Sequence, residues 1–312
     1  MTNNALNLSF IYNEKSGFHS AANNKILEEM VCYWAERGFS VMQFVISNHQ
    51  DFDQMMQQVL LRHADLDHPG IVVAAGGDGT LNAVAARLLH LKVPMGILPM
   101  GTFNYVARAL DIPLDLMAAA EVIATGVKRA IHVAKINDQI YLNNASLGLY
   151  PLFIQKRELY NQKFGRFPLH AYTSGLDVLI REHQELKLEL QIDQEIYSLE
   201  TPLIFFGNNQ LQLADLNLKV AECAKEGRVA GVVMAKSDKL ILFKSLLQLV
   251  RGKIDEASDV HSFSAQQVIV DAEQAQLSVA IDGEIVEMTP PLKIHVEHSA
   301  LNVMVPYVDS SV

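Results

Sequence analysis

Residues 71–82 read IVVAAGGDGTLN, and they carry the strongest fold signal in the sequence. Its first five residues are apolar and either β-branched or small, which is typical of a central parallel strand that is buried on both faces. The strand ends at the glycines of GGDGT, and the sequence at 81–91 is typical of a helix. Glycines let backbone N–H groups approach an anion closely, and a helix N-terminus adds positive potential. The stretch therefore predicts either a phosphate-binding βα turn or a plain tight turn with a capping aspartate.

Asp78 is the unusual member of this turn. A carboxylate does not bind a phosphate directly, because like charges repel each other. Asp78 fits a phosphate site if Mg²⁺ stands between the carboxylate and the phosphates, or if Asp78 handles a hydroxyl proton. The turn matches neither the P-loop pattern nor the dinucleotide pattern GxGxxG.

The segments around this turn alternate between strands and helices. Strands are predicted at 6–12, 41–46, 71–75 and 95–98, and helices at 21–37, 51–64, 81–91 and 115–126. This alternation predicts a doubly wound parallel sheet. A second glycine turn, with Thr102 and Asn104, follows the fourth strand. Both turns should therefore emerge at the carboxyl edge of the sheet, where ligands bind in such folds.

Beyond about residue 128 strands predominate. They are predicted at 131–136, 140–144, 186–192, 197–206, 229–235, 268–270, 277–281, 292–296 and 301–305, with helices at about 169–182 and 238–250. Asn137-Asp138 is a hairpin-type turn, and Pro306 ends the last strand. We expect a nucleotide-binding α/β domain at 1–128 and a β-rich domain at 129–312, whose C-terminal strand can pack back on the first domain.

Composition narrows the class of protein. Half of the 312 residues are hydrophobic, which excludes a mainly disordered chain. The net charge of -10 argues against a nucleic-acid-binding protein. Two cysteines cannot build a disulfide framework or a zinc cluster, so we expect a cytosolic protein, and we expect neither a leader peptide nor a membrane span. One basic cluster is interleaved with aromatic residues and is either a solvated loop or a patch for an anionic membrane; it consists of Lys156, Arg157, Lys163 and Arg166.

Several motifs taken together resemble one family. They are GGDGTLN at 76–82, GTFN at 101–104, NNASLG at 143–148, FGNN at 206–209 and DGE at 282–284. In this order they resemble the diacylglycerol kinase catalytic-domain family, specifically the soluble bacterial lipid kinases related to sphingosine kinases. NEKSG at 13–17 is similar to the first nucleotide loop of that family. The resemblance covers nearly the whole chain and implies an α/β domain followed by a β-sandwich.

The resemblance also implies an activity, which is transfer of the γ-phosphoryl group of ATP to a lipid hydroxyl. The nucleotide site it implies consists of Asn13, Glu14, Lys15, Ser16, Gly17, Ser47, Gly76, Gly77, Asp78, Gly79, Thr80, Leu81, Asn82, Thr102 and Asn104. Asp78 would hold ATP-bound Mg²⁺ or orient the phosphates, and Glu284 would accept the hydroxyl proton. The implied partners are a diacylglycerol-like lipid and an anionic membrane surface, which the protein would contact peripherally from the cytoplasm. A homodimer is left open.

Four positions depart from the family's pattern. Ala83 stands where the family usually has Glu, and Tyr105, His132 and Glu226 stand where it usually has Asp. The last two positions belong to an accessory Mg²⁺ site, which we expect to be empty because a His, a longer acid and the neighbouring Arg228 suit Mg²⁺ poorly. Two alternatives stay open. One is a NAD-kinase-like phosphotransferase acting on a soluble substrate, since NAD kinases share GGDGT, and the other is a non-catalytic nucleotide- or lipid-binding protein.

Overall fold

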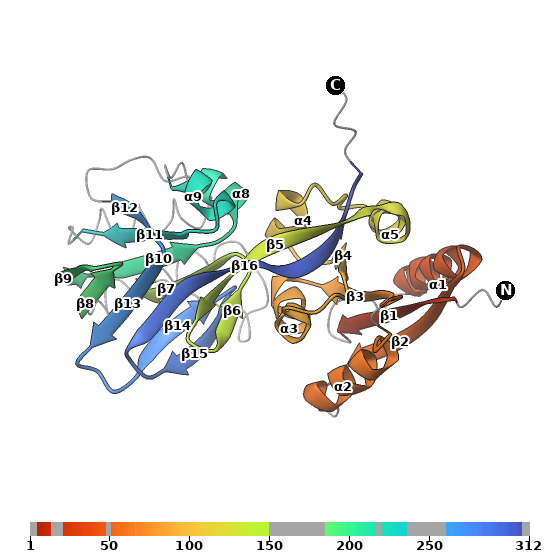
Figure 1. Cartoon of the computed structure of the whole chain (residues 1–312), viewed down its shortest axis with the longest axis horizontal. Helices are drawn as coiled ribbons and strands as arrows, with labels where there is room; N and C mark the ends of the chain where they lie inside the picture. Colours follow the sequence, from red (N-terminus) through yellow and green to blue (C-terminus); the bar gives the residue numbers. More distant parts are fainter. Residues whose placement is uncertain are drawn as a thin grey trace, which may run out of the picture. The chain divides into compact units, whose positions relative to one another are not determined.

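A computed structural model of the chain describes residues 5–13, 21–47, 51–65, 67–149, 185–215, 220–235 and 260–307. The chain forms two compact units, one of Met1–His132 with His298–Val312, and one of Val133–Glu297. Strands β5 (Val127–Ile136) and β16 (Leu292–Val305) each contribute to both units (Figure 1). The domain boundary expected from the sequence stays a prediction.

The first unit is built on a sheet with the strand order β2-β1-β3-β4-β16. Four of its strands are β1 (Leu6–Asn13), β2 (Phe39–Ile46), β3 (Ile71–Gly76) and β4 (Met95–Pro99), and neighbouring members of this set are parallel. Every residue of β3 and β4 is buried, as the apolar runs predict for central strands. β16 lies parallel to β4, with Val303 opposite Met95, so a strand distant in sequence extends this sheet.

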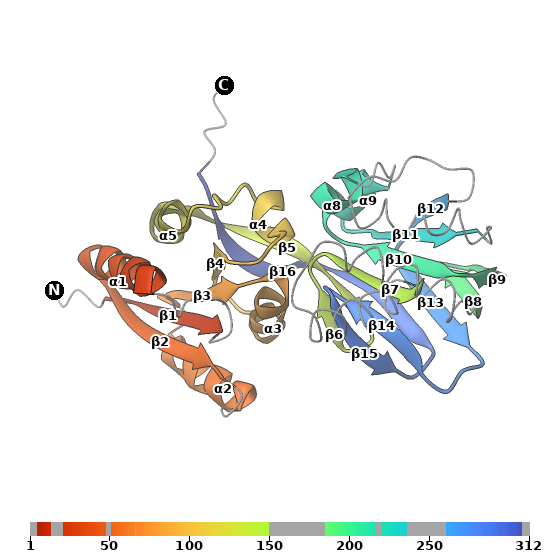
Figure 2. The same ribbon diagram turned by 180° about the vertical axis from the view of Figure 1, so that it is seen from behind.

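Helices cover both faces of the sheet. α1 (Ala21–Glu36) and α5 (Leu116–Thr125) lie on one face, and α2 (Phe52–Arg62) and α3 (Asp78–Leu88) lie on the other (Figures 1 and 2). The wholly buried Trp34 of α1 donates its Nε1–H to the carbonyl of Ala120 in α5 at 2.9 Å. This arrangement confirms the doubly wound α/β fold.

Capping residues set where two of these helices begin. The Asp51 carboxylate accepts hydrogen bonds from the backbone N–H groups of Asp53 and Gln54 at 2.9 and 3.3 Å. Asp115 accepts one from Ala118 at 2.9 Å. These bonds satisfy N–H groups that have no acceptor inside the helix. Both starts agree with the predicted ones.

The second unit is a β-sandwich. One layer is a sheet with the order β12-β11-β10-β7-β14-β15, and the other contains β16-β13-β8-β9 with β5 and β6. The strands are β6 (Gln139–Tyr141), β7 (Asn144–Gly148), β8 (Leu186–Ile192), β9 (Glu195–Thr201), β10 (Leu203–Gly207), β11 (Val229–Met234), β12 (Val260–Ala265), β13 (Gln267–Ala272), β14 (Leu277–Ile281) and β15 (Glu284–Met288). A single cluster of buried apolar side chains draws on both layers, which confirms the predicted sandwich.

Two strand predictions were wrong. The run 197–206 forms two strands, β9 and β10, with Pro202 between them. β9 pairs with β8 and β10 pairs with β7, so the chain changes layers at this proline, which has no N–H to donate to a ladder. The two strands predicted at 292–296 and 301–305 are the single strand β16. Ser299 has a φ of 51°, a local distortion that explains why the alternating pattern breaks there.

Other element boundaries also differ from the prediction. α3 begins at Asp78, three residues before the predicted start, and the strand predicted at 140–144 is divided between β6 and β7. The short helices α4 (Tyr105–Ala109), α8 (Gln210–Asp215) and α9 (Ala221–Lys225), like β12 and β15, were not predicted. Short elements carry few periodic residues, so their pattern is weak. The helices predicted at 169–182 and 238–250 lie outside the described residues.

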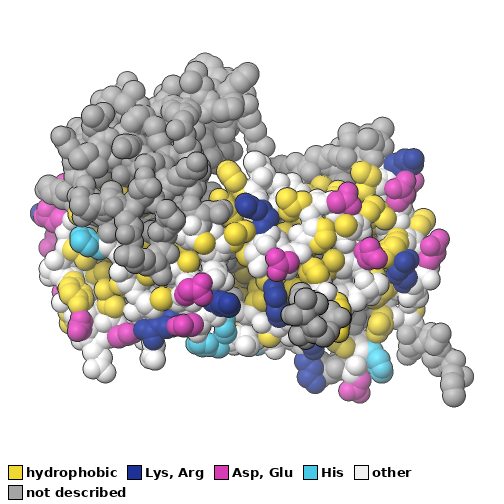
Figure 3. Space-filling view, turned by 90° about the horizontal axis from the view of Figure 1, so that it is seen from above, with side chains coloured by type: hydrophobic (Ala, Val, Ile, Leu, Met, Phe, Trp, Pro, Cys, Tyr) yellow, Lys and Arg dark blue, Asp and Glu magenta, His cyan; other side chains and the backbone are white. Residues whose placement is uncertain are grey.

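The surface carries charges of both signs. On the face shown in Figure 3, acidic side chains are interspersed with basic ones among the described residues, so the negative net charge does not gather into one patch there. In the part of the chain that the structure describes, no helix has the length and apolar character needed to cross a bilayer.

Candidate functional site

The parallel strands of the first unit end level with one another. Asn13 of β1 lies opposite Ile46 of β2, and Gly76 of β3 lies opposite Pro99 of β4. The β1–β3 register places the ends of these two strands together as well. Ser47 follows β2 directly. Asn13, Ser47 and Gly76 therefore share the carboxyl edge of the sheet, as predicted for ligand-binding residues of this fold.

The two glycine turns touch at this edge. A Cβ atom on Gly101 would lie 2.9 Å from the Cα of Gly77, closer than side chains come to a backbone. A Cβ on Gly76 would lie 2.6 Å from the side chain of Thr80. The N–H of Met100 donates to the carbonyl of Gly76 at 3.0 Å and joins the ends of β3 and β4. Glycine is therefore required for this close approach, which leaves a surface made of backbone.

The N-terminus of α3 adds positive potential to that surface. Gly77 is the N-cap and supplies no side-chain bond. The N–H of Leu81 bonds to the carbonyl of Gly77 at 3.1 Å, and the N–H groups before Leu81 are those of the first turn. Such groups have no acceptor within their own helix and suit an anion such as a phosphate.

Asn104 closes the second glycine turn. It has a φ of 51°, its Oδ1 accepts from the N–H of Gly101 at 2.7 Å, and its Nδ2 donates to the Gly101 carbonyl at 2.9 Å. The buried Asn104 amide therefore shapes the turn, while Thr102 lies exposed beside it. The rings of Phe103 and Tyr105 stack with their centroids 5.7 Å apart. Tyr105, one of the departures from the family pattern, thus has an aromatic partner of its own.

The two predicted catalytic acids lie in different units. Asp78 is the half-buried first residue of α3, and Glu284 is the exposed first residue of β15. That the two carboxylates meet across one cleft stays a prediction. The carboxylate oxygens of Asp78 beside the glycine turns are of the ligand type that Mg²⁺ prefers, so this residue fits a nucleotide-bound Mg²⁺. Residues 14–17 of the predicted first loop lie outside the described residues.

Asp282 has a role that sequence reasoning missed. Asp282 and Gly283 have φ values of 46° and 92° and form the two-residue turn between β14 and β15, typical of a type I′ hairpin. The Asp282 carboxylate accepts three backbone hydrogen bonds, from Leu142 at 2.7 Å and from Asn143 and Asn144 at 2.9 Å each. The Asp-Gly pair signals the turn, but no local signal reveals a partner about 140 positions away.

At the positions of the family's accessory metal site, His132 and the neighbouring Arg228 have hydrogen-bond partners of their own. The Nδ1 of His132 accepts from the N–H of Ser299 at 3.1 Å, and burial, with the neighbouring His298, lowers the pKa of His132. Arg228 donates its Nε–H to the Ser264 hydroxyl at 2.8 Å. Glu226 is the exposed C-cap of α9. No cluster of three metal-ligating side chains occurs among the residues described by the structure.

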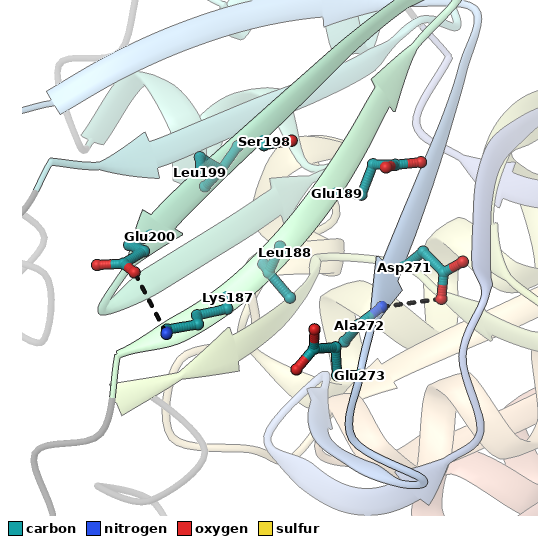
Figure 4. Close-up of a pocket in the computed structure, with 9 residues that line it drawn as sticks. All are labelled: Lys187, Leu188, Glu189, Ser198, Leu199, Glu200, Asp271, Ala272 and Glu273. Atoms are coloured by element: carbon teal, nitrogen blue, oxygen red, sulfur yellow. Dashed lines mark hydrogen bonds and ion pairs between the residues drawn. The ribbon is translucent and has the colours of Figure 1, made fainter.

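A surface pocket of about 520 Å³ lies over β8, β9 and β13 of the second unit (Figure 4). It is lined by Lys187, Leu188, Glu189, Ser198, Leu199, Glu200, Asp271, Ala272 and Glu273. Lys187 forms an ion pair with Glu200 at 3.7 Å, so the remaining charges of the pocket are acidic. Such a surface repels phosphates, and none of the predicted nucleotide-binding residues lines it.

Comparison with known proteins identifies both units. Residues 7–136 match the diacylglycerol kinase catalytic domain, and residues 158–305 match the YegS C-terminal NAD kinase beta sandwich-like domain. The chain is 24% identical to a diacylglycerol kinase of Staphylococcus saprophyticus over 92% of its own length and 93% of that protein. It is 26% identical to an uncharacterized protein of Synechocystis sp. over 79% of its own length, and this match spans 57% of the Synechocystis protein.

A solved structure shows the same fold. The crystal structure of a diacylglycerol kinase from Bacillus anthracis str. Sterne matches with a TM-score of 0.68 at 19% identity, and the match covers 96% of both chains. The two domain matches together span most of the chain. The chain therefore belongs to the diacylglycerol kinase catalytic-domain family, a family of lipid kinases.

Proposed function

We propose that this protein transfers the γ-phosphoryl group of ATP to the hydroxyl of a diacylglycerol-like lipid. The contact between the glycine turns at Gly77 and Gly101 is the observation that carries the proposal. It leaves partly exposed backbone beside the N-terminus of α3, at the carboxyl edge of a parallel sheet. That combination suits the phosphates of a nucleotide, and the family match suggests the lipid acceptor.

Four residues of the site have a chemical role in this proposal. The hydroxyls of Thr80 and Thr102 donate to phosphate oxygens, and Asp78 holds the Mg²⁺ of the nucleotide. Bound Mg²⁺ would offset the negative charge of the transferring phosphoryl group. Glu284 takes the proton of the lipid hydroxyl as that oxygen bonds to the γ-phosphorus and the bond from the γ-phosphorus to the β–γ bridging oxygen breaks.

Asp78→Asn and Glu284→Gln test these roles. Each change keeps the shape of the side chain and removes its charge. We expect either variant to lose ~10²–10³-fold in kcat, roughly 3–4 kcal/mol, with little change in melting temperature. The measurement is transfer of radiolabel from ATP to lipid by purified protein. Wild-type rates from either folded variant would contradict its role.

The same assay distinguishes the alternatives. A total bacterial lipid extract and a panel of pure lipids serve as acceptors, and NAD serves as a soluble acceptor. The resemblance of the second unit to an NAD kinase sandwich favours NAD as the second candidate. Label in NAD but not in lipid would replace the lipid kinase proposal. Nucleotide binding without transfer to any acceptor would point to a non-catalytic member.

A further inference from the structure

Three hairpin turns of the second unit share one hydrogen-bonding device. Each has a left-handed residue at the first of its two turn positions: Asn137, Asp193 and Asp282, with φ values of 49°, 52° and 46°. In each turn this residue donates its own N–H to a carbonyl of a neighbouring segment, at 2.9, 3.0 and 3.0 Å. A side-chain oxygen then accepts the N–H of the same residue that offers the carbonyl. The side-chain oxygen therefore accepts this N–H in place of a backbone carbonyl.

Asn137 and Asp193 use this device on ordinary strand ends. The Oδ1 of Asn137 accepts the N–H of Lys293 at 2.8 Å. The Oδ1 of Asp193 accepts the N–H groups of Gln266 and Gln267 at 2.8 and 3.0 Å. Both turns join their hairpin to a neighbouring strand by hydrogen bonds. They hold none of the residues of the proposed site.

Asp282 uses the device on residues 142–144, the link between β6 and β7. Both of its carboxylate oxygens are engaged: Oδ2 accepts from Leu142, and Oδ1 accepts from Asn143 and Asn144. Three consecutive N–H groups converging on one carboxylate form an anion-binding nest. A carboxylate has about four lone-pair sites. Backbone groups thus occupy most of the capacity that a metal ion or substrate would need.

The link is buried and tied to further elements. The carbonyl of Asn143 accepts the N–H of Asn208 at 2.7 Å, and its Oδ1 accepts Nδ2–H of Asn209 at 2.9 Å. Asn144 donates to Gln212 of α8 at 3.0 Å. Asn143, Asn144 and Asn209 are all buried. The end of β10 and the start of α8 therefore hold the same link that Asp282 holds from the other side.

We infer that Asp282 is a positioning residue that holds Glu284 in place, and not a second acid that touches the substrate. Glu284 closes the hairpin opposite Ile281, directly after the turn. β7 and β14 are neighbours in the sheet (Figures 1 and 2), so fastening Asp282 to 142–144 fixes where β15 begins. This inference rests on the proposed role of Glu284 in lipid phosphorylation. We call the three hydrogen bonds from Asp282 to residues 142–144 the clamp. Without the clamp, the turn and Glu284 move relative to residues 142–144.

Asp282→Asn tests the inference, with Asp193→Asn as a matched control. Asn suits a left-handed turn position, as Asn137 shows, so both hairpins keep their turns. The amide NH₂ group cannot accept, so at least one of the bonds to 142–144 is lost. Backbone hydrogen exchange, read residue by residue, should quicken at 142–144 in Asp282→Asn and stay near the wild-type rate at 266–267 in Asp193→Asn, because Oδ1 alone accepts both N–H groups there and Asn retains that oxygen. Unchanged exchange at 142–144 in Asp282→Asn would overturn the clamp, whatever the enzyme activity.

Kinetics then test the connection to Glu284. Asp282→Asn should lower kcat by ~10²-fold, because a displacement of about 1 Å at a reacting group costs that much, while KM for ATP stays within about twofold. Asp193→Asn should keep kcat within about twofold. Equal losses in both variants, or a wild-type kcat in Asp282→Asn with faster exchange at 142–144, would overturn the positioning role.

A second variant covers the case in which Asp282→Asn does not fold. Asn209→Ala removes the bond to Asn143 Oδ1 and loosens the same link from its other side. It should show the same exchange pattern at 142–144 and the same selective fall in kcat. Wild-type kcat with faster exchange there would overturn the inference. If the wild-type protein phosphorylates no lipid, the proposed function is wrong, and so is the positioning of Glu284 for catalysis. Hydrogen exchange at 142–144 still tests whether Asp282 holds these residues.

Discussion

Single atoms decide the shape of the proposed phosphate site. Gly77 and Gly101 both lack a Cβ, but the space beside them differs. A Cβ on Gly77 would meet the Cα of Gly101 at 3.4 Å, an ordinary contact, whereas a Cβ on Gly101 would meet the Gly77 Cα and the Asn104 Oδ1 at 2.9 Å. The two glycines therefore make unequal demands on the structure, although both stand in similar motifs.

Gly101→Ala should consequently be more harmful than Gly77→Ala. The added methyl group of Gly101→Ala must displace backbone or break the Asn104 bond to Gly101, which should cost about 1–3 kcal/mol of unfolding free energy. Gly77→Ala should unfold within about 0.5 kcal/mol of the wild type, as tolerated substitutions do. Urea unfolding of both variants measures the difference. Equal midpoints would contradict the packing argument.

His63 makes stability depend on pH. It is buried at the end of α2, where its Nδ1–H donates to the carbonyl of Pro69 and its Nε2 accepts from the Ser9 hydroxyl at 2.8 Å. Burial lowers the pKa of His63, the Pro69 bond opposes this, and the charge of Arg62 lowers the pKa further. The unfolded chain, with a His pKa of about 6.5, therefore binds the proton first as the pH falls.

Unfolding free energy should thus decrease as the pH falls below about 6.5 and level off below the lower pKa of the folded state. His63→Gln should make the unfolding free energy depend less steeply on pH. The unfolding free energy itself should be lower in this variant, because the buried contacts of His63 change. His132, whose pKa is also lowered, should leave a residual slope of the same sign. Urea titrations at a series of pH values check this. A slope that His63→Gln leaves unchanged would remove His63 as the cause.

At the scale of helices and strands, contacts between helices stabilise the fold in addition to the caps of single helices. α1 and α5 are separated by three strands and three helices along the chain, and the Trp34 bond to Ala120 joins them. The Trp34 ring also meets Phe10 of β1 edge-on, with centroids 5.6 Å apart. One side chain therefore connects two helices and the sheet that they cover.

Trp34→Phe should reduce the unfolding free energy by about 1–3 kcal/mol, because the buried Ala120 carbonyl loses its donor. The aromatic contact with Phe10 is retained in part, so the loss should be smaller than for Trp34→Ala, for which truncation adds a cavity. Urea unfolding of the two variants tests this order. A Trp34→Phe variant as stable as the wild type would show that the hydrogen bond contributes little.

For the molecule as a whole, membrane contact is predicted from the basic cluster at 156–166. The basic cluster lies outside the described residues, so its role rests on the sequence. An enzyme that phosphorylates a membrane lipid has to reach a bilayer. Each cation near an anionic membrane contributes about 1 kcal/mol, and this attraction is screened by salt.

Replacing all four residues of the basic cluster with Gln should weaken sedimentation with anionic liposomes and leave activity in neutral detergent largely intact. A control with the same loss of charge replaces four exposed lysines elsewhere: Lys25, Lys92, Lys187 and Lys225. The control should sediment as the wild type does, and wild-type binding should weaken as salt rises. Equal loss in both quadruple variants would indicate net charge as the cause and remove the basic cluster from the mechanism.

Much of the fold was predictable because its signals are local. The buried run of β3, the glycine turns after β3 and β4, and the caps Asp51 and Asp115 depend on a few neighbouring residues each. Backbone preferences and hydrophobic periodicity act over that range. The α/β order of the first unit and the change to a β-rich second part followed from them, and the family resemblance implied the sandwich. Boundaries were less predictable, as the layer change at Pro202 and the unbroken β16 show.

Long-range partners were beyond the reach of such signals. That Gly101 meets Gly77, and that Asp282 binds the amides of 142–144, depends on strand register. Register is settled by how the whole core packs, since a slip of one residue would turn every side chain to the opposite face. The amino-acid sequence alone thus predicted which residues could bind phosphate and indicated where the chain turns. The folded packing decided which of those residues touch, because hydrogen bonds between distant segments form only once the sheets have aligned them.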